Sequence, residues 1–146
     1  WATWTRGWNL FEQDGKRLLN ELVARNLTRE FDYNKSYAYT KMLKNQIDGK
    51  IKSWAILWYA SIFLKNKLCL YPGQSLVRHI GNDGSGTNFG RTNILDTGIA
   101  NRPIEIKKIL LTEDLKMRRE IGLYFKRSRP PLLNRIENKI AGVLGK

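Results

Sequence analysis

Residues 53–64 read Ser53-Trp-Ala-Ile-Leu-Trp-Tyr-Ala-Ser-Ile-Phe-Leu64 and contain no charged side chain. An uncharged run that is apolar on nearly every face is typical of a helix buried inside a domain. Ser53 is well placed to cap its first turn. The run is shorter than the roughly 20 residues that span a bilayer, so it predicts a core helix and not a membrane span.

On both sides of this run, four segments are expected to be helices. Three of them carry apolar residues at helical spacing, and the segment from residue 112 begins with Thr112-Glu113-Asp114, which is typical of a helix start. Asp14 is a suitable N-cap for the first of them, and Gly49 is a suitable terminator for the second. The four segments are 14–25, 36–47, 112–127 and 132–144.

Short strands are expected between these helices. Residues 68–71 and 75–80 are candidate strands, and residues 103–111 form a short extended piece. Residues 81–90 contain four glycines, which indicates a loop. The sequence therefore predicts an α+β fold that is mainly helical, with about five helices and a few short strands.

The length and composition limit the class of protein. A chain of 146 residues with 42% hydrophobic residues is one domain in size and can build a core, which excludes a wholly disordered basic tail. Cys69 is the only cysteine and His79 the only histidine. An intrachain disulfide, a cysteine-rich zinc site and a multi-histidine metal site are therefore excluded, and we expect no metal ligands in this chain.

The net charge is +13, and its density is highest at the C-terminal end. Residues 1–100 carry 14 − 8 = +6, and residues 101–146 carry 12 − 5 = +7. A basic surface of this kind suits nucleic acid, an anionic membrane surface or a phosphorylated substrate, and it also serves as an ordinary solvated surface.

All five tryptophans lie in two groups. Trp1, Trp4 and Trp8 stand close together around Arg6, and Trp54 and Trp58 are one helical turn apart. An exposed tryptophan face stacks on a sugar ring or a base, whereas a tryptophan on an apolar helix fills core space. Both interpretations stay open for the second group.

The glycine loop and three carboxylates are the other candidates for chemistry. The loop lacks the Lys of a Walker A motif, but its backbone amides, with Ser85 and Thr87, can hold a diphosphate or a hydroxyl-rich ligand. The alternative is a plain surface loop with Asn82-Asp83-Gly84 as its turn. The carboxylates available for acid/base chemistry are Asp48, Asp83 and Asp96.

Three phrases of the chain carry a resemblance to a known family. Ser53-Trp-Ala-Ile-Leu-Trp-Tyr-Ala-Ser61 and Leu68-Cys-Leu-Tyr-Pro-Gly-Gln-Ser-Leu-Val-Arg-His-Ile-Gly-Asn-Asp-Gly-Ser-Gly-Thr-Asn88 resemble the C-terminal part of bacterial family 2 glycosyltransferases. The opening Trp1-Ala-Thr-Trp4-Thr-Arg6-Gly-Trp8 resembles the phrase after the second acidic motif of that family. The similarity covers most of residues 1–97.

The resemblance implies a piece of a GT-A type enzyme, which transfers a sugar from a nucleotide-diphosphate donor to a cell-surface glycan or lipid-linked acceptor. Residues 1–100 would be the C-terminal part of its catalytic domain and residues 101–146 a basic helical tail. The nucleotide-binding half, with its Asp-x-Asp motif and a divalent Mg or Mn ion, would precede Trp1. The implied location is the cytoplasm, at the inner face of a bacterial membrane.

The resemblance also implies which residues bind and which react. The substrate-binding set would be Trp1, Trp4, Arg6, Trp54, Trp58, Arg78, Asn82, Asp83, Ser85, Thr87 and Asn88. Relatives read Asp-Ser-Trp-Ala where this chain has Lys52, and an ammonium group cannot act as a general base at its ordinary pKa. Asp48 is the nearest substitute and the candidate catalytic residue.

A second departure concerns the loop. Many relatives have His where this chain has Asn88, which can hydrogen-bond a phosphate or hydroxyl group but is a poor metal ligand. The alternative function is a basic nucleic-acid-binding module or a non-catalytic interaction domain. The chain shows no helix-turn-helix, zinc-finger or RRM signature, so nucleic acid is not the favoured partner.

Overall fold

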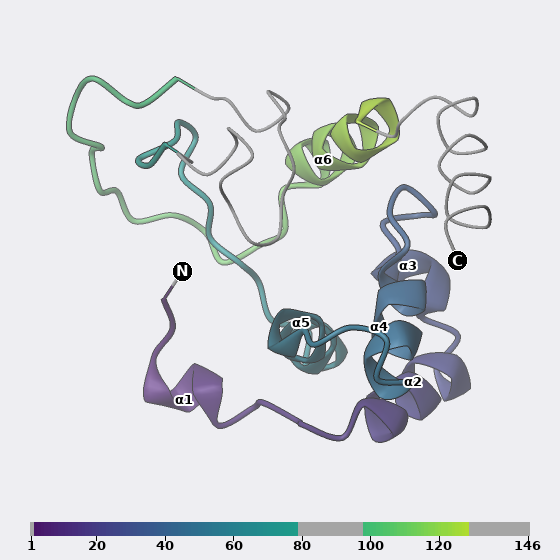
Figure 1. Ribbon diagram of the computed structural model, residues 1–146. Coiled ribbons are helices and arrows are strands. Elements are labelled where there is room, and N and C mark those ends of the chain that lie inside the picture. Colours follow the sequence, from purple (N-terminus) through teal and green to yellow (C-terminus); the bar gives the residue numbers. More distant parts are fainter. Residues whose placement is uncertain (1, 79–97, 129–146) are drawn as a thin grey trace. The chain divides into compact units, whose positions relative to one another are not determined.

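The computed structural model describes residues 2–78 and 98–128 (Figure 1). These residues are mostly helical and form two compact units, one made of residues 2–68 and 113–128 and the other of residues 69–78 and 98–112. The chain passes from one unit to the other after residue 68 and after residue 112, whereas the sequence predicts a domain boundary at residue 100. The helices are α1 (Thr5–Trp8), α2 (Gly15–Ala24), α3 (Thr28–Phe31), α4 (Tyr39–Ile47), α5 (Trp54–Leu64) and α6 (Leu115–Arg127).

Helix α5 forms the centre of the first unit, as its sequence predicts. Seven of its eleven residues are buried, and Figure 1 shows it beside α2 and α4, with which it packs. Each large apolar side chain buried in this way contributes about 1.5–3 kcal/mol to folding. The buried core cluster consists of Leu18, Leu22, Phe31, Leu43, Ile56, Leu57, Ala60 and Leu64.

The start of each long helix follows from local hydrogen bonds. Asp14 caps α2, because its carboxylate accepts from the backbone N–H groups of Lys16 and Arg17. Ser53 occupies the N-cap position of α5, but its hydroxyl makes no capping bond. Its backbone N–H instead donates to Gln46 Oε1 of α4, at 2.5 Å. The end of α4 is thereby joined to the start of α5.

Helix α4 begins three residues later than the sequence predicts. Its first residue is Tyr39, and the Thr40 backbone N–H donates to the side chain of Asp32, at 2.6 Å. This carboxylate comes from the preceding turn and takes the role of an N-cap, which a local pattern search does not detect.

Four helices end in the same way, with a left-handed residue two positions after the last helical one. These residues are Asn26, Tyr33, Gly49 and Asn66, with φ between 50° and 71°. In each case the backbone N–H groups of the left-handed residue and of the residue after it donate to carbonyls of the last turn, as in Leu27 N–H to Leu22 O at 2.9 Å. This is the Schellman arrangement, which satisfies carbonyls that a helix end otherwise leaves unpaired. The prediction that Gly49 ends a helix is confirmed.

Aromatic rings connect α3, α5 and α6. Phe31 is fully buried and stacks on Tyr59, with 4.7 Å between ring centroids. Tyr59 donates its hydroxyl hydrogen to Phe31 O, at 3.1 Å. Phe125 of α6 packs against Tyr37 and Tyr33 at 5.0 and 5.6 Å. The helix predicted over residues 112–127 is confirmed, with Asp114 as its N-cap.

The second unit corrects the expectation of short strands. Within residues 69–78 and 98–112 the only strand-like pairing is one parallel bridge between Ser75 and Ile99. The candidate strand at 68–71 is irregular, and its Leu70 and Tyr71 side chains are exposed. A strand needs a partner for its backbone groups, and a favourable composition does not supply one. The predicted helix over 132–144 lies outside the described residues.

Candidate functional site

The tryptophans of the two sequence groups meet where α1 packs on α5. Trp8 stacks on Trp58 with 5.4 Å between ring centroids and meets the edge of Trp54 at 6.3 Å. Phe11 also stacks on Trp8, with 4.8 Å between ring centroids. We call Trp8, Phe11, Trp54 and Trp58 the aromatic cluster. It joins two sequence phrases that lie more than 40 residues apart.

The members of the aromatic cluster differ in exposure. Trp58 is 8% exposed and fills core space, whereas Trp54 is 53% exposed and Trp8 44%. Core filling therefore describes Trp58, whereas a stacking role for Trp54 stays a prediction. Exposed indole faces on a packed base form a rigid apolar platform, which can stack against the flat face of a ligand ring.

Trp4 and Arg6 lie on the same short segment as Trp8 and form a pair of their own. Trp4 is 71% exposed, and the Arg6 guanidinium lies over its ring, 4.9 Å from the centroid. A cation above an indole face is attracted by the ring quadrupole. Both predicted binding residues are thus solvent-accessible, and the guanidinium keeps donors free for an anionic or hydroxyl-bearing ligand.

The two residues predicted to bear on general-base chemistry lie near the α4–α5 junction. Asp48 is the C-cap of α4, and its carboxylate accepts from Lys50 Nζ at 2.7 Å. Both side chains of this pair are about half exposed. Lys52 immediately precedes the Ser53 N-cap of α5 and is exposed. A positive charge there is unfavourable for the helix dipole, whose N-terminal end is itself positive.

One of the remaining predicted binding residues lies within the described ranges. Arg78 belongs to the second unit and is exposed. Trp1 and the loop residues Asn82, Asp83, Ser85, Thr87 and Asn88 lie outside the described residues, as does Asp96.

The described ranges were compared with the requirements of a metal site and of a membrane span. No three His, Cys, Asp or Glu side chains there lie close enough together to hold a metal ion. None of the helices within residues 2–78 and 98–128 has the length and hydropathy that crossing a membrane requires.

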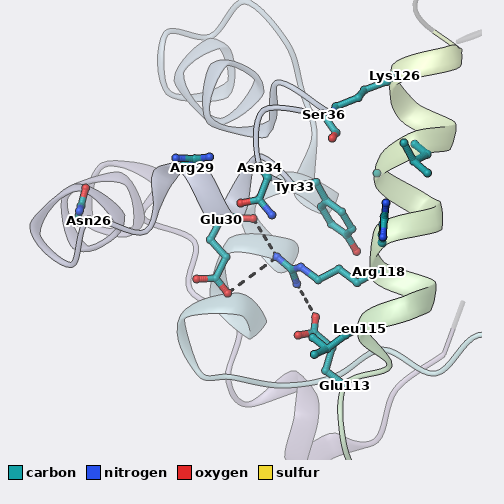
Figure 2. Close-up of a pocket in the computed structure, with 13 residues that line it drawn as sticks. Asn26, Arg29, Glu30, Tyr33, Asn34, Ser36, Glu113, Leu115, Arg118 and Lys126 are labelled. Carbon is teal, nitrogen blue, oxygen red and sulfur yellow. Dashed lines mark hydrogen bonds and ion pairs between the residues drawn. The ribbon is translucent and has the colours of Figure 1, made fainter.

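The structure also shows a hollow that the sequence did not predict. It encloses about 750 Å³ between residues 26–36 and α6 (Figure 2). Arg118 of α6 reaches across it to Glu30, 88 positions away in sequence. Neither residue stands out in the sequence, because a pairing over such a separation leaves no local pattern.

Comparison of the chain with protein-family models, with curated proteins and with solved structures finds no match. A function for the chain therefore has to be argued from its own residues and their geometry.

Proposed function

We propose that this chain is the acceptor-side portion of a family 2 glycosyltransferase with a GT-A fold. The observation that carries the proposal is the aromatic cluster. Two of the phrases that resemble the family, around Trp8 and around Trp54, are distant in sequence and form one surface. A merely accidental likeness gives no reason for these phrases to meet.

The aromatic cluster suits the recognition of a sugar. The C–H groups on one face of a pyranose ring fit a flat indole surface. About half of Trp54 and somewhat less of Trp8 is exposed to solvent, at 53% and 44%. Arg6 adds a fixed cation beside Trp4, which suits a phosphate or hydroxyl group on the same ligand. In the proposed role these residues bind and orient the acceptor.

The chain does not contain all the parts of the reaction. No Asp-x-Asp occurs in its 146 residues, and the described residues do not fit a divalent metal ion, since they hold no group of three ligands. No step of the proposal therefore depends on metal binding to this chain. Donor binding would fall to the nucleotide-binding half, and Asp48 would be the nearest carboxylate to take the acceptor proton.

Tryptophan fluorescence tests the sugar-binding role. We expect titration with neutral tetrasaccharides, cellotetraose and maltotetraose, to quench the emission saturably with at least one of them. Trp54→Ala should weaken that binding about tenfold, the loss expected for one ring-stacking contact of about 1.4 kcal/mol. Tyr124→Ala is the matched control, because Tyr124 is an aromatic residue of similar exposure on α6. Equal affinity in all three proteins would refute the role of the cluster.

A salt titration separates this function from the alternative. A nucleic-acid-binding module would bind single-stranded oligonucleotides with an affinity that falls steeply as salt rises. Binding of a neutral oligosaccharide involves no counterion release and should stay nearly constant between 50 and about 200 mM salt. Steeply salt-dependent oligonucleotide binding without any sugar binding would favour the alternative.

A further inference from the structure

The hollow beside α6 is a second concave surface, and it shares no residue with the aromatic cluster. Thirteen residues line it, from α3 and its flanking turns on one side and from α6 on the other (Figure 2). Its volume of about 750 Å³ lies within the range of about 300–1,000 Å³ that small-molecule sites occupy.

Arg118 holds the two walls of the hollow together. It donates to Glu113 at 2.5 Å and to the backbone carbonyl of Glu30 at 3.2 Å, and its guanidinium lies 4.9 Å from the Tyr33 ring centroid. Its burial disfavours the charge, but the hydrogen bond and attraction from Glu113 outweigh this and raise the pKa of Arg118. Arg118 is therefore a permanently charged brace, already neutralised by its own partners.

The other cations of the lining are not neutralised. Arg29, Arg119 and Lys126 form no ion pair within the described residues. The two carboxylates of the lining, Glu30 and Glu113, both face Arg118. Three like charges around one hollow repel one another, and an anion bound among them removes that repulsion.

The Ser36 hydroxyl belongs to the wall of the same hollow. Ser36 is 3% exposed and lines the hollow. Gly122 of α6 lies opposite it, and a Cβ there would stand 3.3 Å from Ser36 Oγ. A hydroxyl group that lines a hollow can donate a hydrogen bond to a bound anion. Figure 2 shows Ser36 on the same side of the hollow as Asn34, facing α6.

We propose that this hollow binds a phosphate group carried by a small soluble molecule. Arg29, Arg119 and Lys126 supply the charge, and guanidinium groups match the geometry of phosphate oxygens. Ser36 and Asn34 supply neutral donors. The volume exceeds that of a lone phosphate, so the ligand is a phosphate ester or a diphosphate.

Isothermal titration with inorganic pyrophosphate tests the proposal in the unmodified chain. The double variant Arg119→Ala/Lys126→Ala should weaken binding at least about tenfold, since charge-assisted hydrogen bonds are lost. The matched control is Lys41→Ala/Lys44→Ala, which removes the same net charge from exposed positions on α4. An equal loss in both double variants would show only general attraction between opposite charges and would overturn the proposal.

Ser36→Ala gives an independent readout, because binding should change while folding should not. The change removes one hydroxyl group and keeps the Cβ, so the melting temperature should stay nearly unchanged while pyrophosphate binding falls about tenfold. A lower melting temperature with unchanged binding would overturn the role of Ser36. Vesicles containing phosphatidic acid form the second arm. Binding to them without any response to pyrophosphate would assign the phosphate to a lipid headgroup and overturn the soluble ligand.

Discussion

Replacing Phe31 by alanine should remove a large share of the stability of the first unit. Phe31 is fully buried, and its ring meets Tyr59, Phe63 and Tyr39 at centroid distances of 4.7, 5.3 and 6.0 Å. Phenylalanine-to-alanine changes in cores cost about 3–5 kcal/mol. The three ring contacts place Phe31 near the upper end, because each such pair adds about 0.5–1.5 kcal/mol. We therefore expect a loss of about 4–5 kcal/mol.

Urea unfolding followed by circular dichroism at 222 nm measures this loss. Since a domain of this size has a total stability of about 5–15 kcal/mol, the urea midpoint should fall by about a quarter or more. Phe31→Leu keeps most of the volume and should lose about 1.5 kcal/mol. Val23→Ala on α2 is the control, because Val23 is 60% exposed and should change stability by no more than about 0.5 kcal/mol. A Phe31→Ala midpoint equal to that of the control would refute the core described above.

Three further predictions concern the cap of α2, the buried Tyr59 and the proposed sugar transfer. Asp14→Ala should cost about 1 kcal/mol in urea unfolding, because α2 loses its N-cap, and Asp14→Asn should restore most of it. Burial raises the pKa of Tyr59 above its ordinary value, so its contribution to stability is complete below about pH 10 and is lost as pH rises above that value. Urea midpoints should therefore fall above pH 10 less steeply in Tyr59→Phe than in the original chain. Under the proposed function, the chain alone should transfer no sugar from a nucleotide-sugar. When the chain is joined to the nucleotide-binding half that this function requires, Lys52→Asp should raise the rate of transfer. Turnover by the chain alone would contradict the need for a nucleotide-binding half. No gain from Lys52→Asp would show that the residue at position 52 does not limit transfer and would leave Asp48, or a different mechanism, to supply the base.

The sequence predicted the elements whose patterns are local and long enough to read. Helix α5 could be predicted from its uncharged run, and α2 from its apolar spacing and the Asp14 cap. Helices α1 and α3 have four residues each, which is too few for a 3.6-residue period to show. Their positions depend on the rings of Trp8 and Phe31, which pack against residues that are distant in sequence.

The two candidate sites also differ in how much of each could be predicted from the sequence. The two groups of tryptophans could be recognised as candidates from the sequence. The contact of Trp8 with Trp58 could not be predicted, because it depends on the tertiary packing. The hollow could not be predicted at all. Its brace joins Arg118 to Glu30 across 88 positions, and its cations look like any others in a chain with a net charge of +13.

The shared way in which four helices end restricts which mutations the chain can accept. Surface positions usually tolerate most substitutions, with effects within about 0.5 kcal/mol. Asn26, Gly49 and Asn66 are exposed, yet their φ values of 55°, 71° and 51° exclude valine, isoleucine and threonine, for which this conformation is an outlier. A saturation library of the gene should therefore be depleted of β-branched residues at these three surface positions as strongly as core positions are depleted of charge.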